Sequence, residues 1–183
     1  TSLFGGSVRC VYETVFITNW SMVSELTGVF WTSKMMSFTL KNLESNIPII
    51  YDAFYYGSDI RYQPCLIKLI SLIKAFPERK FIIAHSGGYE VLKYFLHLRE
   101  FNNVGYDLSF SLQYLYDSSC IKDIIKLIKY TSPKNIFYGS DYPKASPKTQ
   151  YETLHKIANN LGLSNEDKNG IFISSWIDFT RIS

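Results

Sequence analysis

The hydrophobic pattern from residue 46 onward alternates short apolar runs with longer amphipathic stretches. Apolar runs cover residues 47–52, 80–85, 103–109 and 135–141, and each has the length of a single strand. Strands that are apolar on both faces are typical of parallel sheets buried between layers of helices. The pattern therefore predicts four parallel strands with helices between them.

The stretches after these strands repeat their apolar positions with the period of a helix. One predicted helix is opened by Pro64 and closed by Pro77, and the next runs from Gly87-Gly88 to about Phe101. Further helices are predicted from apolar positions at 121, 124, 125 and 128, from Pro147, and from 164 to about 181. The last begins with capping-box spacing from Ser164 to Asp167.

The first 45 residues are less regular. Residues 8–17 predict a strand and residues 36–45 a short helix, but the stretch between them has no clear period. The whole chain of 183 residues is interpreted as one domain of the α/β class.

Each of the four predicted strands carries a polar side chain at or near its carboxyl end. These side chains are Asp52, His85, Asp107 and Asp141. In (β/α) barrels and open parallel sheets, chemistry takes place at the carboxyl edge. Imidazole and carboxylate groups there suit zinc, iron or manganese. His85 and Asp141 are the candidates, and the alternatives are a hydrogen-bonded structural histidine and a loop-capping aspartate.

Composition narrows the function further. The net charge is only +3 and the basic residues are scattered, so nucleic-acid binding is not expected. No apolar run approaches the ~20 residues that span a bilayer, and no signal peptide or membrane partner is expected. Three widely spaced cysteines favour a reducing compartment, with the cytoplasm as the expected location.

Four segments together resemble the amidohydrolase-related family that includes aminocarboxymuconate-semialdehyde decarboxylase. Residues 81–88 (FIIAHSGG) resemble its strand–His–x–Gly–Gly segment, and residues 75–80 resemble the approach to that strand. Residues 103–109 (NVGYDLS) match the next strand, and residues 137–143 (FYGSDYP) resemble the Phe–x–Gly–Ser–Asp–x–Pro signature of the last barrel strand. The resemblance covers about residues 46–182, in the order and spacing of the family.

The resemblance implies the C-terminal half of a distorted (β/α)₈ barrel that holds a divalent metal, commonly zinc, with manganese or iron as alternatives. It implies that His85 is a ligand or lies close to the metal. It also implies that Asp141 binds the metal and transfers protons. Asp107 and Ser109 are expected to contact a small-molecule substrate.

The sequence departs from the family at two ligand positions. It contains no His-x-His pair, which the family carries on its first strand, and Asp52 stands where a histidine normally ends the fifth strand. Asp52 is an alternative oxygen ligand or a solvated carboxylate at the start of a loop. A catalytic zinc normally has about three protein ligands, so the chain alone is expected to bind metal weakly or not at all.

A full barrel needs eight strands and about 250 residues, and residues 48–141 account for strands five to eight. Three interpretations stay open: a fragment of a longer enzyme, a half-barrel completed by a second chain, or a non-catalytic scaffold derived from the family. Exposed apolar edges predict self-association into a homo-oligomer. The function favoured by the sequence is a metal-dependent hydrolase, or a related decarboxylase, acting beside a carbonyl group.

Overall fold

A computed structural model describes residues 15–17, 41–42, 47–54 and 66–180 of the chain. Its centre is a five-stranded sheet in which all neighbouring strands are parallel. The strands are β1 (Val15–Ile17), β2 (Ile49–Asp52), β3 (Phe81–Ala84), β4 (Val104–Asp107) and β5 (Ile136–Phe137). The predicted α/β class with parallel strands is confirmed.

The strands follow one another across the sheet in chain order, β1-β2-β3-β4-β5. Doubly wound sheets reverse their strand order at a switch point, whereas (β/α) barrels keep it sequential. The order is thus that of a partial barrel. Of the predicted strand at 8–17, the structure describes Val15–Ile17, and the remainder lies outside the described residues.

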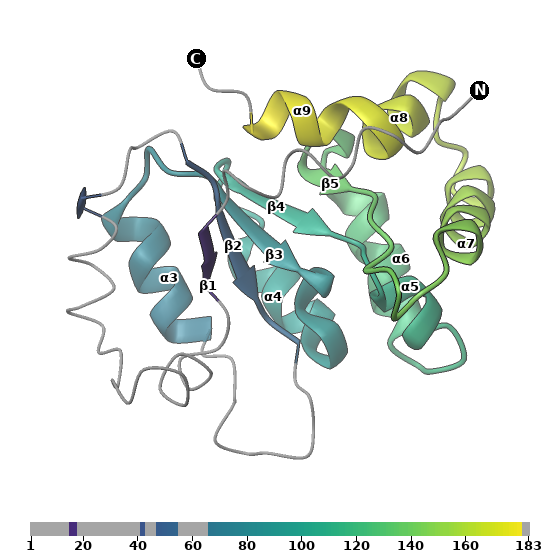
Figure 1. Cartoon of the computed structure of the whole chain (residues 1–183), viewed down its shortest axis with the longest axis horizontal. Helices are drawn as coiled ribbons and strands as arrows, with labels where there is room; N and C mark the ends of the chain where they lie inside the picture. The colour runs from purple at the N-terminus through teal and green to yellow at the C-terminus, as the bar shows by residue number, and fades with distance from the viewer. Residues whose placement is uncertain (1–14, 18–40, 43–46, 55–65, 181–183) are drawn as a thin grey trace.

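Helices cover one face of the sheet (Figure 1). The helical elements between the strands are α3 (Leu66–Ala75), the 3-10 turn η3 (His85–Glu90), α4 (Val91–Leu98), α5 (Ser111–Tyr114), α6 (Ile121–Tyr130) and the short turn η4 (Pro133–Asn135). After β5 come α7 (Pro147–Asn160), α8 (Asn165–Asn169), the π-helical segment η5 (Gly170–Ser174) and α9 (Ser175–Thr180).

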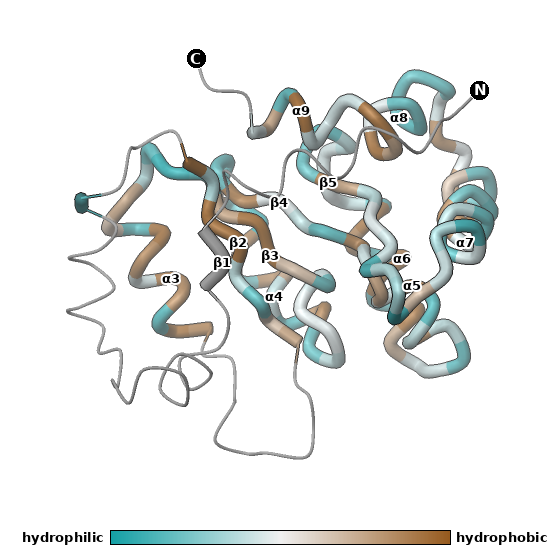
Figure 2. The backbone as a smooth tube through the Cα atoms, viewed as in Figure 1, coloured by the Kyte–Doolittle hydropathy of each residue, from teal (hydrophilic) through white to brown (hydrophobic). Residues whose placement is uncertain are grey.

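The main core lies between the sheet and helices that include α3, α4, α6 and α7. Alternate strand residues such as Ile49, Phe81 and Ile83 point into it, together with Leu69 and Ile73 from α3. Figure 2 shows the hydrophobic colour concentrated in β2, β3 and α3. On this face of the sheet, the apolar residues of the strands are buried by contact with the helices.

The other face of the sheet carries a smaller apolar cluster, formed by Ile50, Ile82, Ala84, Phe137 and Phe179 with Trp176 packed against it. Phe179 and Trp176 belong to α9. Ser175 at the start of α9 donates a hydrogen bond from its hydroxyl to the Pro133 carbonyl, before β5. Helices α8 and α9 accordingly lie at the end of the sheet away from the arrowheads of β2 and β3 (Figure 1).

Three predicted elements differ from the structure. The strand expected over residues 135–141 is only Ile136–Phe137, because the Tyr138 N–H bonds to the Ile171 carbonyl of η5 instead of continuing the sheet. The helix expected from Gly87 begins at Val91, after the tight turn η3. The single terminal helix is divided into α8, η5 and α9.

No helix of the described residues is long and apolar enough to cross a membrane. The cap predicted for the last helix is confirmed, since the Ser164 hydroxyl accepts a hydrogen bond from the Asp167 N–H at 3.0 Å. The short helix predicted at 36–45 falls mainly outside the described residues.

Candidate functional site

Polar side chains gather where β2, β3 and β4 end. Asp52 is paired with Ala84 in the sheet, so His85 follows directly beside it, and Asp107 is paired with Phe137 on the other side. The parallel arrangement therefore brings Asp52, His85 and Asp107 to one edge, as the sequence predicted. Asp141 lies four residues beyond Phe137 in the loop after β5.

The backbone at this edge is strained. His85 and Ser86 have φ of 54°, Phe110 has 60° and Asp141 has 61°. Within the described residues these are the non-glycine positions with positive φ, and each lies in a loop that leaves the carboxyl end of a strand. Such conformations cost of order 1–3 kcal/mol each and cluster at functional sites, which makes this edge the candidate site.

His85 is the best-defined side chain of the site. It is 9% exposed, and its Nδ1 lies 2.9 Å from the Ser109 carbonyl oxygen. A carbonyl oxygen can only accept a hydrogen bond, so Nδ1 must carry the proton. In the neutral ring Nε2 is then the nitrogen with a lone pair, the form that accepts a proton or binds a metal.

Asp107 holds the ends of β3 and β4 together. Its Oδ1 accepts a hydrogen bond from the Ser109 N–H at 3.0 Å, and its Oδ2 accepts from the Ser109 hydroxyl and, at 3.4 Å, from the His85 N–H. The Ser86 hydroxyl also donates to the Asp107 carbonyl at 2.8 Å. The expectation that Asp107 and Ser109 contact substrate stays a prediction.

Asp52 has a similar local role. Its Oδ1 accepts a hydrogen bond from the Phe54 N–H at 2.9 Å, which is an Asx turn two residues long. Asp107 forms the same kind of turn with Ser109. Both carboxylates thus fix the direction in which the chain leaves its strand.

Two glycines allow the loops to approach each other closely. A Cβ on Gly139 would lie 2.9 Å from both Asp107 Oδ1 and Ser109 Cβ, so a side chain there would displace one of them. Gly88 has φ of +57°, and a Cβ there would lie 2.9 Å from the Phe54 ring. At these two positions of the sequence signatures, close packing therefore leaves no room for a side chain.

Two aromatic rings contact His85, and two tyrosine rings pack against them. Phe54 lies 5.6 Å from the His85 ring and Phe110 lies 5.9 Å from it, both edge-on. Phe110 stacks on Tyr114 with centroids 4.7 Å apart, and the Tyr89 hydroxyl donates to the Tyr114 hydroxyl at 2.8 Å. This hydrogen bond is the main reason why the pKa of Tyr89 is raised to about 12.

Sequence reasoning did not select these four aromatic residues. Phe54, Tyr89, Phe110 and Tyr114 all follow within seven residues of a strand end, which is the signal that could have found them.

The predicted metal ligands do not form a complete set among the described residues. No group of three His, Cys, Asp or Glu side chains in the described part of the chain is placed to hold a metal ion. Asp141 is half-buried, and its carbonyl accepts a hydrogen bond from the Lys144 N–H at 2.9 Å. No hydrogen bond between Asp141 and His85 occurs in the structure as described.

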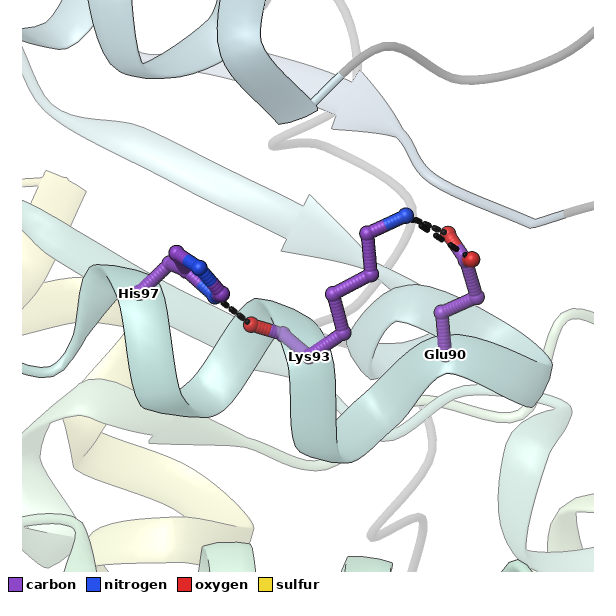
Figure 3. Close-up of polar contacts among 3 residues, drawn as sticks. All are labelled: Glu90, Lys93 and His97. Atoms are coloured by element: carbon purple, nitrogen blue, oxygen red, sulfur yellow. Dashed lines mark hydrogen bonds and ion pairs between the residues drawn. The ribbon is translucent and has the colours of Figure 1, made fainter.

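The other two histidines lie on helices of the outer layer. His97 on α4 is exposed, and Figure 3 shows its ring directed at the Lys93 carbonyl, 2.8 Å from Nδ1, beside the Lys93–Glu90 ion pair. His155 on α7 stacks on Tyr151. With three histidines in the sequence, His85 is the one that the fold brings to the carboxyl edge.

Comparison with solved structures shows the same fold at low identity. An uncharacterised TIM-barrel protein from Bordetella bronchiseptica is 17% identical, with a TM-score of 0.59, and the match covers 80% of this chain and 48% of that one. A putative metal-dependent hydrolase from Lactobacillus casei is 18% identical, with a TM-score of 0.61, over 80% and 43% of the two chains. For 2,6-dihydroxybenzoate decarboxylase from Rhizobium the identity is 13% and the TM-score 0.52, over 81% and 54%.

The match spans about half the length of these three proteins. No curated protein matches the chain. The sequence profile described as Amidohydrolase matches residues 32–174, which is most of the chain and includes β2 to β5 with His85 and Asp141. The chain therefore belongs to the amidohydrolase family.

Proposed function

We propose that this chain carries part of the active site of a metal-dependent hydrolase that acts on a small molecule, or of a related decarboxylase. The observation that carries the proposal is the state of His85. Its Nδ1 is committed to the Ser109 carbonyl, so its Nε2 is the nitrogen available for chemistry at the strained carboxyl edge. This edge of the sheet is where (β/α) barrel enzymes carry their active sites, which favours a chemical role for His85 over a purely structural one.

The chemistry would use the side chains of two strand ends. His85 would accept a hydrogen bond or a proton through Nε2. Asp141, in the loop after β5, would accept a proton from a water molecule that attacks a carbonyl-type carbon and deliver it to the leaving group. The aromatic rings of Phe54 and Phe110 beside His85 would limit the access of bulk water.

Membership of the family implies a divalent metal, for which zinc is our first proposal and manganese or iron the alternatives. The residue types fit in part, since His85 offers an imidazole nitrogen in the right protonation form and Asp141 and Asp52 offer oxygen ligands. Their number and arrangement do not fit, because the described residues hold no three-ligand group and a catalytic zinc needs about three protein ligands. Any complete site would include ligands from outside the described residues.

The finer assignment, to the aminocarboxymuconate-semialdehyde decarboxylase-like group, is also part of the proposal. Its support is the pair of sequence signatures around His85 and Asp141. The structure gives a reason for their glycines, since both Gly88 and Gly139 face atoms of the opposing loops.

A second candidate function is a non-catalytic binding or scaffold protein derived from the family, or a catalytically incomplete fragment. It is favoured by the incomplete ligand set of the described residues. This candidate predicts that substitutions at His85 and Asp141 change no measurable activity.

A turnover screen separates the two candidates. The purified chain, supplied with zinc, manganese or iron, is assayed against a panel of amides, esters, lactones and aromatic carboxylic acids. The proposal expects any turnover to disappear in Asp141→Asn while the far-UV circular dichroism stays unchanged. Asp117→Asn, the same change at an exposed position, is the matched control and should keep full activity. Activity that persists in Asp141→Asn would contradict the proposed role of Asp141.

A further inference from the structure

The Asp107 carboxylate joins the loops that leave β3 and β4. Three donors converge on it, the Ser109 N–H, the Ser109 hydroxyl and the His85 N–H. Two of these donors come from the residue whose carbonyl binds the His85 ring. The third is the main chain of His85 itself, so one carboxylate connects the ends of β3 and β4.

These bonds fix the acceptor that faces the His85 ring. The Ser109 N–H and hydroxyl are both held by Asp107, which leaves Ser109 little freedom to turn. Its carbonyl oxygen stays 2.9 Å from His85 Nδ1, and its hydroxyl oxygen lies 3.2 Å from the same nitrogen. The ring is also confined laterally by Phe54 at an interplanar angle of 88° and by Phe110 at 75°.

An aspartate is the residue type that this junction requires. An ionised carboxylate only accepts hydrogen bonds, and it can accept several at once. An asparagine of the same shape has one accepting oxygen and an NH₂ group that donates. In one orientation its NH₂ group would face the Ser109 N–H, and in the other it would face the Ser109 hydroxyl and the His85 N–H. In both orientations a donor would face a donor.

We propose that Asp107 is a positioning residue, which keeps the Ser109 carbonyl on Nδ1 and thereby holds His85 in the form with an unprotonated Nε2. The inference rests on the proposed function, in which His85 acts through Nε2. It gives Asp107 and Ser109 a role that differs from the substrate contact expected from sequence. Partners that orient a reactive or metal-binding histidine in this way commonly change activity when they are substituted.

The protonation form of each histidine can be measured without any substrate. In protein labelled with ¹⁵N-histidine, long-range ¹H–¹⁵N spectra distinguish a ring protonated on Nδ1 from one protonated on Nε2. Spectra are recorded in alkaline buffer, above the ordinary histidine pKa of about 6.5. The chain has three histidines, so His97→Gln and His155→Gln complete the assignment.

The other histidines are internal references. His97 Nδ1 is bonded to the Lys93 carbonyl at 2.8 Å on α4, beside the Lys93–Glu90 ion pair (Figure 3). His155 Nδ1 faces Asn159 Nδ2, a donor, at 3.1 Å, which places the proton of His155 on Nε2. Neither ring contacts Asp107, and neither spectrum should respond to substitution there.

The wild-type protein should show His85 protonated on Nδ1. In Asp107→Asn the His85 resonances should shift toward the Nε2-protonated form, while those of His97 and His155 stay in place. Asp117→Asn is the matched control, with the same chemical change at an exposed residue. Ser109→Ala keeps the main-chain N–H and carbonyl, so His85 should remain protonated on Nδ1 in that variant.

Either of two results would overturn the inference. The first is an unshifted His85 spectrum in a folded Asp107→Asn protein. The second is a wild-type His85 protonated on Nε2, which decides the matter even where Asp107→Asn fails to fold. A protein with the expected spectra but no turnover or metal binding would instead count against the proposed function alone.

Discussion

Substitution of Gly139 by alanine tests whether the loop after β5 approaches the end of β4 as closely as the site requires. The added Cβ would lie 2.9 Å from Asp107 Oδ1 and 2.9 Å from Ser109 Cβ. Ordinary carbon–carbon contacts are about 3.5–4.0 Å, so the Ser109 Cβ would have to move by at least about 0.6 Å. Asp107 and Ser109 are bonded to each other and to His85, which makes this movement costly.

The expected magnitude follows from two opposing effects. Overpacking a well-packed region costs about 1–3 kcal/mol, whereas a change from glycine to alanine lowers the entropy of the unfolded chain and returns about 0.4–1 kcal/mol. The net loss is about 1–2 kcal/mol. For a chain of this size that corresponds to a fall in Tm of roughly 2–8 °C.

Unfolding in urea is the assay. Gly139→Ala should lower the denaturation midpoint while leaving the m-value unchanged. Gly170→Ala is the matched control, because its Cβ meets only the Ser175 hydroxyl oxygen at 3.3 Å and its φ of −52° is helical. A Gly139→Ala protein at least as stable as the wild type would refute the close packing of the two strand ends.

Two further predictions concern tyrosines. The pKa of Tyr89 is raised from 10.0 to about 12 because its hydroxyl donates to Tyr114, so Tyr114→Phe should lower it toward 10.0 in a phenolate absorbance titration. Between these two values the folded protein keeps the Tyr89 hydroxyl proton that the unfolded chain loses. The contribution of this hydroxyl to stability is therefore complete below pH 10 and is lost as pH rises toward 12. An unchanged Tyr89 titration in Tyr114→Phe would count against the hydrogen bond. Tyr106 has a buried hydroxyl without a partner among the described residues, and burial raises its pKa, so Tyr106→Phe should keep or increase the unfolding free energy by up to about 1 kcal/mol. A loss of more than about 1 kcal/mol in urea unfolding would show that this hydroxyl has a bonding partner.

The strands and their polar ends could be predicted because the signal for them is local. The runs that became β2, β3 and β4 are apolar on both faces, and the side chains of Asp52, His85 and Asp107 follow directly from where these runs stop. The cap of α8 by Ser164 is equally local, since donor and acceptor lie three residues apart.

The differences from prediction arise where contacts join distant parts of the chain. The last strand stops at Phe137 because the next N–H bonds to Ile171, and no local pattern encodes that partner. The helix was predicted to begin at Gly87-Gly88, but these glycines form a turn before it and pack against Tyr94 and Phe54.

The sequence predicted which residue types lie at the candidate site, but it did not predict the contacts between them. The sequence selected His85 and placed it at the carboxyl edge. It could not show that Ser109 holds its Nδ1, since the two residues are 24 positions apart. The aromatic rings near His85 were missed because they come from segments after three different strands, which are far apart in the sequence.

The central claim is that His85 and Asp141 belong to one metal-dependent site, and metal binding tests it most directly. Zinc is titrated into the metal-free wild type, His85→Ala, Asp141→Ala and the control His97→Ala, and bound metal is also measured by mass spectrometry. Because the ligand set of the described residues is incomplete, the account predicts weak binding that approaches one equivalent only at high zinc concentration in the wild type and in His97→Ala. Affinity should fall about tenfold or more in His85→Ala and in Asp141→Ala, as expected when a ligand is removed. Equal binding by all four proteins, or no binding by any of them, would contradict the account, and the second result would favour the non-catalytic candidate.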